Sequence, residues 1–545
     1  LARFDLILPL RVMLMVMALL NAATAVLIYR LVKNNLSHAV ALLAAPFWAF
    51  NFYIHNNVYE FGLETPLAAF AIVLFIYKLS QFERDWPPKR AKPVTARQLA
   101  TLAVSAVIVM FSRLDLVFLA VIGGIWIIFR GKPIRFLLPL DMVIIFISMT
   151  ASVALRTDIT TYNSLFAASA VQAVFLALII KIISLYMFGA YQHPRANSIW
   201  KTIRQTILAL TTSAVLITGL YLLLIQLGIG KDFPRSAFII DLGISTFLIL
   251  ALRLTAYWLG NEKIKVAAQA ITPLYELQTN WKKWLTESIP YYGILGGALS
   301  LYMLYNKIVF GISSPVSGQI KRWWGTMGET VYDSPAPNWT SFLGIGFQGA
   351  FDAWQPVSNM FLWLARLIKP LYRGSNTEDE RYYIVMFVFV LIMLAILFLN
   401  ARRALRAVTN FAIIPLIAGS GIQILSYTTT AYGGAKEWYW ISQMVLVTLA
   451  GSVLLDLILR PLQHLPSHSL CSRTMWRAVP GKIKSARVIL EFTSITFGIF
   501  LAYNFGLHVI SIMPYNYFPA DRPYMEVLPY LEENTPPGSI IGMTG

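Results

Sequence analysis

Charged and aromatic residues gather in three short stretches, each of which lies beside a long apolar run. Residues 55–67 (HNNVYEFGLETPL) hold Glu64, residues 112–115 (SRLD) hold Arg113 and Asp115, and residues 428–443 hold Lys436, Glu437 and Trp438. A carboxylate can accept the proton of a hydroxyl, an arginine can bind a phosphate through two parallel hydrogen bonds, and an aromatic ring can cover the apolar face of a sugar. These residue types indicate a site for sugar and phosphate groups.

The elements that must position these residues are helices in a membrane. The chain has 545 residues, of which 57% are hydrophobic and 13% are charged. Soluble domains carry roughly 25% charged residues, so the composition predicts an all-α polytopic membrane protein. A single cysteine excludes an internal disulfide framework, and the six histidines show no metal-ligand spacing. Phosphate-cradling and dinucleotide-binding glycine motifs are absent from the sequence, so we expect no cofactor and no metal.

At roughly 20 apolar residues per span, we expect 14 transmembrane helices. Their approximate ranges are 6–30, 38–54, 65–80, 98–112, 115–129, 136–153, 164–187, 206–229, 237–260, 288–309, 382–400, 407–427, 440–459 and 488–512. Residues 1–512 are therefore expected to form one membrane domain. Residues 513–545 carry a short amphipathic pattern followed by a Pro-Pro-Gly turn, which predicts the start of an external α/β domain.

Most of the 44 lysines and arginines fall in alternate loops of this arrangement. The positive-inside rule makes those loops cytoplasmic, so the net charge of +18 is interpreted as topology and not as nucleic-acid binding. All three polar stretches then lie on the outer face of a bacterial-type cytoplasmic membrane.

The same outer face is expected to carry the long loop 311–381. Its first part combines a cation with paired aromatic rings, at Lys321, Trp323 and Trp324. Its second part, 347–369, is predicted to form an amphipathic helix in the membrane interface. Asp352 belongs to the polar residues of this face, but the sequence assigns it no role.

Each stretch also has a simpler interpretation. Glu64 is equally compatible with a solvated loop acid, Arg113 with a snorkelling side chain paired to Asp115, and the tryptophans with an aromatic belt at the headgroup level. Three such stretches on one face favour a shared site. Asp141, Asp241 and Glu491 lie within or at the ends of expected spans and receive no function.

The order of these stretches resembles the GT-C class of integral-membrane glycosyltransferases, in particular members that use polyprenyl-phosphate sugars and the related mannosyl and arabinofuranosyl transferases. Phe61-Gly62-Leu63-Glu64-Thr65 is similar to the class's G-[LM]-E-[ST] turn, Ser112-Arg113-Leu114-Asp115 to its [ST]-R-x-D, with Leu in place of the usual Pro, and Trp438-Tyr439-Trp440 to its late aromatic element.

The resemblance implies a polyprenyl-phosphate sugar donor, an acceptor that is an envelope glycan, lipid or protein, and a membrane-lipid environment. It implies substrate-binding roles for Glu64, Arg113, Asp115, Lys321, Trp323, Trp324, Lys436, Glu437 and Trp438. In this class the catalytic aspartate lies in the first outer loop, so the base is expected upstream of Leu1, in a chain read as a fragment of a longer protein.

Two rival functions stay open from the sequence alone. One is a transporter or flippase of lipid-linked saccharides, which needs polar groups near the middle of the bilayer. The other is a noncatalytic subunit of an envelope-assembly complex.

Overall fold

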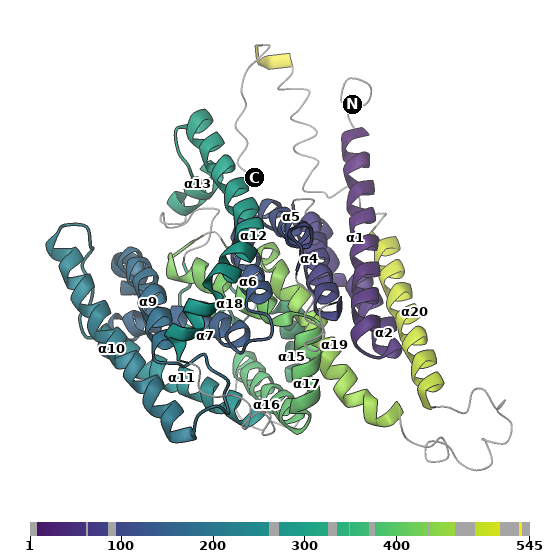
Figure 1. The fold of residues 1–545 in the computed structure, drawn as a ribbon. Helices are drawn as coiled ribbons and strands as arrows, with labels where there is room; N and C mark the ends of the chain where they lie inside the picture. Colours follow the sequence, from purple (N-terminus) through teal and green to yellow (C-terminus); the bar gives the residue numbers. More distant parts are fainter. Residues whose placement is uncertain are drawn as a thin grey trace.

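The structure is a computed structural model that describes residues 8–60, 64–85, 94–260, 272–324, 335–347, 349–369, 377–433, 435–463, 486–512 and 533–536. These residues are almost entirely helical (Figure 1). The α-helices are α1 (Leu8–Asn35), α2 (His38–Phe50), α3 (Phe52–His55), α4 (Thr65–Asp85), α5 (Ala96–Ser112), α6 (Val117–Ile128), α7 (Ile134–Thr157), α8 (Ile159–Thr161), α9 (Ala167–Met187), α10 (Ile199–Gln226), α11 (Ala237–Leu259), α12 (Pro273–Phe310), α13 (Val316–Trp324), α14 (Trp339–Phe342), α15 (Gln355–Leu367), α16 (Glu378–Leu399), α17 (Ala401–Asn410), α18 (Ile413–Thr429), α19 (Ile441–Gln463) and α20 (Ala486–Ile512).

Four shorter helical turns connect them: the π-helical turns η1 (Asn56–Glu60) and η3 (Tyr162–Phe166) and the 3₁₀ turns η2 (Leu114–Leu116) and η6 (Glu437–Tyr439). η1 falls in the first polar stretch, η2 in the second and η6 in the third. The polar stretches thus interrupt the regular helices, as their sequences predict.

Within the described residues, ten helices are long and apolar enough to cross a bilayer, or eleven if α17 and α18 form one bent span. Three further apolar helices, α2, α5 and 114–128, are shorter than a typical span. The fold is therefore that of a helical membrane protein. The expected count of 14 depends on whether these three short helices cross the membrane, and it stays a prediction.

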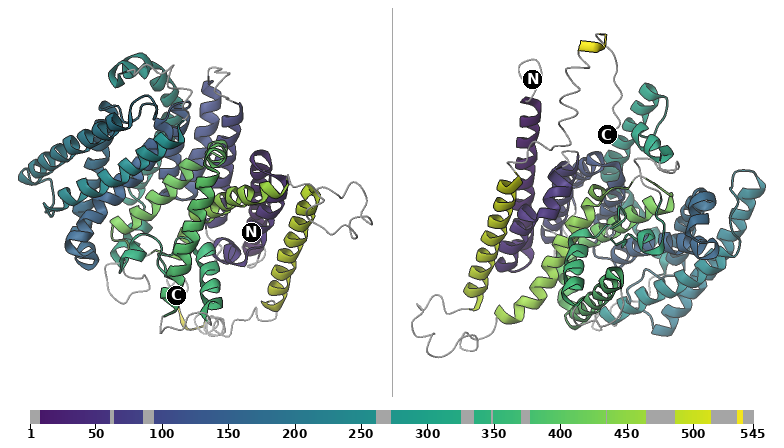
Figure 2. Two further views of the ribbon diagram at one scale, coloured as in Figure 1. Left: turned by 90° about the horizontal axis from the view of Figure 1, so that it is seen from below. Right: turned by 180° about the vertical axis from the view of Figure 1, so that it is seen from behind.

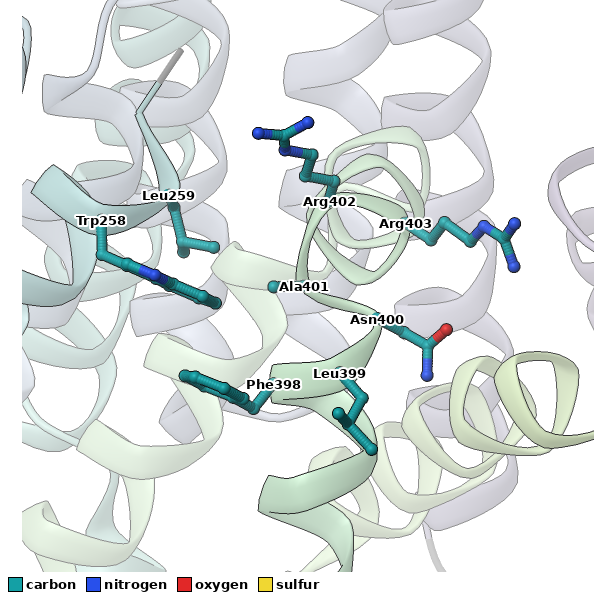
Figure 3. A pocket seen from close by; sticks show the side chains of 8 residues that line it. All are labelled: Trp258, Leu259, Phe398, Leu399, Asn400, Ala401, Arg402 and Arg403. Atoms are coloured by element: carbon teal, nitrogen blue, oxygen red, sulfur yellow. The ribbon is translucent and has the colours of Figure 1, made fainter. Parts of the chain in front are cut away.

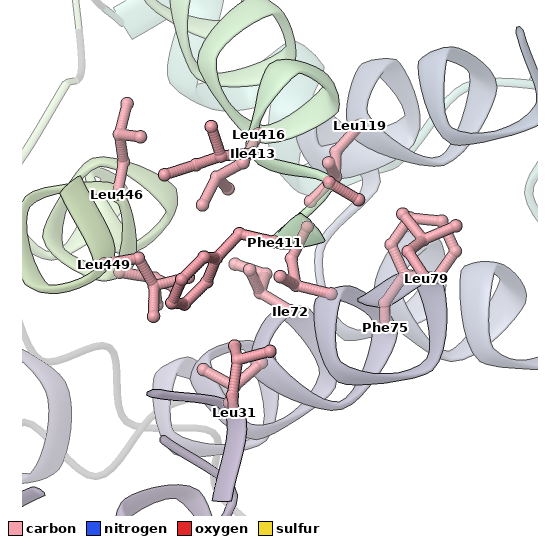
Figure 4. Packing of buried hydrophobic residues seen from close by; sticks show 14 of the residues in the cluster. Leu31, Ile72, Phe75, Leu79, Leu119, Phe411, Ile413, Leu416, Leu446 and Leu449 are labelled. Carbon is pink, nitrogen blue, oxygen red and sulfur yellow. The ribbon is translucent and has the colours of Figure 1, made fainter. Parts of the chain in front are cut away.

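The span expected at 407–427 is observed as two helices, α17 and α18, between which the chain turns by 82°. Ala412 adopts a left-handed backbone conformation, with φ of 51°, which ends α17. Phe411 next to it is fully buried among side chains of α1, α4 and α19, such as Leu31, Ile72 and Leu449 (Figure 4). Burial of this ring compensates for the strained backbone that follows it.

The buried apolar side chains form two large clusters. One joins α1, α2, α4, α5, α6 and α19, and the other joins α7, α9, α10 and α11. Figures 1 and 2 show the two groups of helices on opposite sides of the molecule, with α18 between them. Since α18 contacts both α6 and α7, this helix connects the two clusters.

Several expected boundaries shift. The span expected at 288–309 is part of the longer α12, whose first turn is capped by Thr272 and begins with Pro273. The amphipathic helix expected at 347–369 is observed as α15, which starts only at Gln355. The expected external α/β domain at 513–545 lies outside the described residues except for residues 533–536.

Small residues let α18 approach α6 closely. A Cβ atom added at Gly419 would lie 2.9 Å from the Cα atom of Leu119 on α6. A Cβ atom added at Gly421, half a turn further along, would meet only the methyl groups of Val143, at 3.5 Å. Gly419 therefore sets the distance between the two helix backbones, as small residues do where membrane helices pack.

We expect Gly419→Ala to lower the thermal stability of the protein in lipid nanodiscs by about 1–3 kcal/mol, the usual cost of overpacking. Gly421→Ala is the matched control, because it makes the same change in helix propensity without a backbone clash. Its melting temperature should stay equal or rise. Equal melting temperatures for the two variants would contradict the close approach of α18 to α6.

Candidate functional site

Arg113 lies at the centre of a polar cluster built from residues far apart in the sequence. It is the C-cap of α5, and its extended backbone (φ −158°, ψ 126°) takes the chain out of the helix. Nε and Nη2 donate to the two carboxylate oxygens of Asp115, at 3.2 and 3.0 Å. Nη1 donates to the carbonyl oxygen of Trp438 at 3.1 Å, and the guanidinium lies 4.6 Å from the ring centre of Tyr439. The second and third polar stretches are thus in direct contact.

Asp115 is held by α18 as well as by Arg113. Its Oδ2 atom accepts hydrogen bonds from the amide of Gln423 at 2.7 Å and from the hydroxyl of Tyr427 at 2.8 Å. These two residues are four apart and so share one face of the helix. Ser442 donates to Oε1 of Gln423 at 2.5 Å, which extends the network to the start of α19. Gln423 and Tyr427 could not be recognised from the sequence, since both lie at or within the end of an expected membrane span among other small polar residues.

Glu64 brings the first polar stretch to the same place. Its carboxylate lies 3.6 Å from Nη1 of Arg113, so the expected proximity of these two residues is observed. The two side chains differ in burial, because Arg113 is 6% exposed and Glu64 is 49% exposed. Thr65 fixes the turn before α4 by donating to the carbonyl oxygen of Val58 in η1 at 2.5 Å. In this ion pair Glu64 is therefore the partner that outside molecules can reach, while Arg113 is buried.

The third stretch places Lys436, Glu437 and Trp438 beside this cluster. All three side chains are partly exposed, whereas Tyr439 and Trp440 after them are buried. η6 contacts η1, so the Glu437 turn lies against the first polar stretch. Trp440 points the other way and donates its indole N–H to the carbonyl oxygen of Ala350 at 2.9 Å. This bond attaches the loop before α15 to the site.

Asp352 in that loop is a candidate that the sequence did not single out. It is 1% exposed, and its Oδ1 atom accepts hydrogen bonds from the hydroxyl of Ser358 at 2.8 Å and from the backbone N–H of Trp354 at 3.1 Å. Burial raises the pKa of this carboxyl to about 7. Burial, and then the charges of Asp352 and Glu437, raise the pKa of Tyr53, so these three side chains share one electrostatic environment.

The remaining expected residues lie on α13, which follows the end of α12 (Figure 1). Trp323 is 58% exposed there. The side chains of Lys321 and Trp324 lie outside the described residues. Their membership of a shared site with Arg113 stays a prediction.

Two acids to which the sequence assigned no role are paired inside the second cluster of helices. Asp241 on α11 accepts a hydrogen bond from Nζ of Lys181 on α9 at 2.6 Å. Asp141 on α7 pairs with Arg253 on α11 at 2.5 Å. Each of the four side chains is at most 3% exposed. Glu491, in contrast, is a partly exposed residue of α20 that pairs with Arg487 at 3.0 Å and lies 3.4 Å from the ring of His38 on α2.

No group of three or more His, Cys, Asp or Glu side chains that could hold a metal ion occurs within the described residues.

Comparison with protein-family models, with curated proteins and with solved structures found no match to this chain. The geometry of the cluster around Arg113 is accordingly the basis for interpreting its function.

We expect Arg113→Met to destabilise the protein by about 3–5 kcal/mol, because Asp115 would be left buried without its cation. Arg156→Met is the control, since Arg156 is an exposed arginine that also lies near a helix end and bonds only to Ser236 among the described residues. Thermal unfolding in lipid nanodiscs measures both. Equal losses of stability would show that Arg113 does not hold the three stretches together.

The raised pKa of Asp352 predicts a pH-dependent stability. The unfolded carboxyl has a pKa near 3.9, so the folded state holds its proton over a pH range in which the unfolded state has lost it. The contribution of this group to stability is then complete below about pH 4 and is lost as the pH rises towards about 7.

Asp352→Asn keeps a neutral side chain at every pH and serves as the reference. The melting temperature of the natural protein should therefore fall relative to that of Asp352→Asn between pH 4.5 and 7.5. A constant difference between the two proteins over this range would contradict a raised pKa of Asp352.

Proposed function

We propose that this protein is a membrane glycosyltransferase of the GT-C type, which moves a sugar from a polyprenyl-phosphate donor to an acceptor of the cell envelope. The observation that carries the proposal is the contact of the exposed Glu64 with the buried Arg113, itself fixed by Asp115 and by the Trp438 carbonyl group. The three motifs that resemble the GT-C class thus converge around one guanidinium group.

The location of this cluster suits a lipid-linked donor. It forms where the long apolar helix α4 begins, where the shorter apolar helix α5 ends, and where η1, η2 and η6 interrupt the helical pattern. A donor with a polyprenyl tail can remain in the bilayer while its phosphate and sugar reach such a boundary. The proposal places this boundary on the outer face, in agreement with the distribution of lysines and arginines.

The reaction needs a base and a group that stabilises the leaving phosphate. A carboxylate takes the proton of the acceptor hydroxyl, the hydroxyl oxygen forms a bond to the anomeric carbon, and the bond from that carbon to the phosphate oxygen breaks. The electron pair of the broken bond stays on the polyprenyl phosphate. We assign the phosphate to Lys436 and to the edge of Arg113 that faces Glu64, because positive charge at this point stabilises the developing anion.

The resemblance implies a base upstream of Leu1, but Asp352 is the carboxylate best suited to this role among the described residues of this chain, and we assign the base to it. Its pKa of about 7 matches the working range of a general base at neutral pH. Its Oδ1 atom is occupied by Ser358 and Trp354, while its Oδ2 atom accepts no hydrogen bond from the described residues. Trp440 connects its loop to the aromatic element beside Arg113.

A transporter of lipid-linked saccharides is the second candidate. The buried pairs Lys181–Asp241 and Arg253–Asp141 favour it, since charged groups inside a membrane bundle often mark a path for ions or substrates. In both pairs, however, the charges are directly opposed and hydrogen-bonded, as they are in pairs that only fix helix positions.

The test of the proposed function is turnover of a polyprenyl-phosphate sugar by the full-length protein in lipid vesicles, followed by the release of polyprenyl phosphate without added nucleotide. Asp352→Asn should lower turnover by about 100-fold or more, the usual contribution of general acid–base catalysis. Glu378→Gln is the control, because this carboxylate pairs with the exposed Arg366 and should leave the rate unchanged.

The pH dependence provides a second readout. If Asp352 is the base, turnover rises with pH and levels off above about pH 7, where the carboxylate is ionised. Movement of the saccharide across the bilayer without cleavage of the donor would favour the transporter instead. Full activity of a folded Asp352→Asn protein would remove Asp352 as the base and leave the transferase proposal standing.

A further inference from the structure

A cavity of about 490 Å³ lies where α11 ends, α16 ends and α17 begins (Figure 3). None of its lining residues belongs to the cluster around Arg113, and the proposed glycosyl transfer does not use it. Its walls combine two aromatic rings, Trp258 and Phe398, with two arginines, Arg402 and Arg403. This combination of an apolar wall and a basic rim needs an explanation of its own.

The aromatic wall is open to the surroundings of the protein. The rings of Trp258 and Phe398 are parallel within 2°, with their centres 4.6 Å apart. Trp258 is 48% exposed and Phe398 is 63% exposed. Both residues lie in the last turns of long apolar helices, where aromatic side chains mark the boundary between hydrocarbon and headgroups. The wall is therefore suited to contact acyl chains at that boundary.

The basic rim comes from α17, a short helix with two different faces. Ala404 and Ala407 are buried against the bundle, while Arg402, Arg403 and Arg406 are exposed. Such a helix lies in the membrane interface with its cations directed towards headgroups. The 82° turn before α18 gives α17 this direction, different from that of the helix that follows it.

The guanidinium groups of Arg402 and Arg403 carry N–H donors that a ligand in the cavity can use. Within the described residues, neither Arg402 nor Arg403 forms an ion pair with a carboxylate. Figure 3 shows their side chains leaving α17 in different directions, with the stacked rings of Trp258 and Phe398 at the opposite wall. A guanidinium group without an internal partner is well suited to bind a phosphate oxygen pair.

We propose that this cavity binds the phosphodiester headgroup of an anionic glycerophospholipid, with Arg402 and Arg403 on the headgroup and an acyl chain along Trp258 and Phe398. Charge complementarity selects an anionic lipid over a zwitterionic one. Arg402 and Arg403 stand between the expected spans 382–400 and 407–427, in a segment that the positive-inside rule makes cytoplasmic. Anionic lipids of the cytoplasmic leaflet attract such segments. The site is independent of the proposed transferase reaction.

The experiment measures lipid binding to the full-length protein in neutral detergent, by the rise in melting temperature on titration with phosphatidylglycerol. A ligand that binds only the folded state raises this temperature, and the rise grows with the logarithm of the ratio of ligand concentration to dissociation constant. Phosphatidylglycerol should stabilise the natural protein, and phosphatidylcholine should have little effect. The double variant Arg402→Gln, Arg403→Gln should bind phosphatidylglycerol about 30-fold more weakly, since each basic residue contributes about fivefold to such binding.

The matched control is Lys201→Gln with Arg204→Gln, which removes the same charge from exposed positions of α10, between the expected spans 164–187 and 206–229 and so on the same expected cytoplasmic side. Because these two residues do not line the cavity, this variant should change the affinity for phosphatidylglycerol by less than about twofold. A general effect of net charge would weaken binding in both double variants alike. Equal weakening of binding in the two double variants would overturn the site, as would unchanged binding in the variant of Arg402 and Arg403.

Inorganic phosphate distinguishes a lipid from a free anion. A rise in melting temperature with phosphate equal to that with phosphatidylglycerol would overturn the lipid assignment. Trp258→Ala gives a second measurement on a residue that is half exposed, and it should weaken phosphatidylglycerol binding without changing the charge of the site. Equal affinity for phosphatidylglycerol in Trp258→Ala and in the natural protein would contradict the acyl-chain contact.

Discussion

The buried guanidinium of Arg113 is the group on which the polar architecture depends. Removing an arginine from water is costly unless charges and hydrogen-bond acceptors surround it. Here one carboxylate lies two residues away in the chain, a backbone carbonyl group comes from Trp438, and the ring of Tyr439 covers one face. The carbonyl group and the ring come from a distant segment, so satisfying Arg113 requires η2 and η6 to meet. The position of Glu64 follows from that meeting.

Opposed charges also connect the helices away from the site. Arg130 on the turn after α6 pairs with Glu287 on α12 at 2.6 Å, and Arg135 on α7 pairs with Glu83 on α4 at 2.8 Å. Lys181 and Arg253 bind their partners between α7, α9 and α11 in the same way. In a membrane, a leucine meets an equally apolar environment whether it contacts lipid or another helix. Apolar contacts alone therefore fix the relative position of two membrane helices only weakly. A pair of opposite charges fixes the relative position of the two helices that carry it, since any other position leaves a buried charge unpaired.

The positions of the helices could be predicted from the sequence far better than the contacts between them. Long apolar runs predicted most of the long helices to within a few residues. The gathering of polar stretches on one expected face predicted that Glu64 and Arg113 would lie close together, and the simpler interpretation of SRLD predicted the pairing of Arg113 with Asp115. The partners of Asp141 and Asp241 could not be predicted, because Asp141 lies 112 residues from its arginine and Asp241 lies 60 residues from its lysine. The role of Asp352 could not be predicted from the sequence either, since a single acid between Phe351 and Ala353 forms no recognisable motif. Its chemistry comes from burial, which is a property of the packed structure.

α18 shows how packing and the polar site are coupled. Gly419 brings this helix against Leu119 of α6, and Gln423 lies one turn further along, where it bonds to Asp115. Asp115 belongs to η2, the turn that leads directly into α6. Both contacts therefore join α18 to the segment formed by η2 and α6. The contact at Gly419 is between backbones, and the contact of Gln423 is a hydrogen bond. A side chain at position 419 would push α18 away from α6 and lengthen the bonds of Gln423 and Tyr427 to Asp115. The absence of a side chain at that glycine is thus a requirement of the polar cluster as well as of the apolar core.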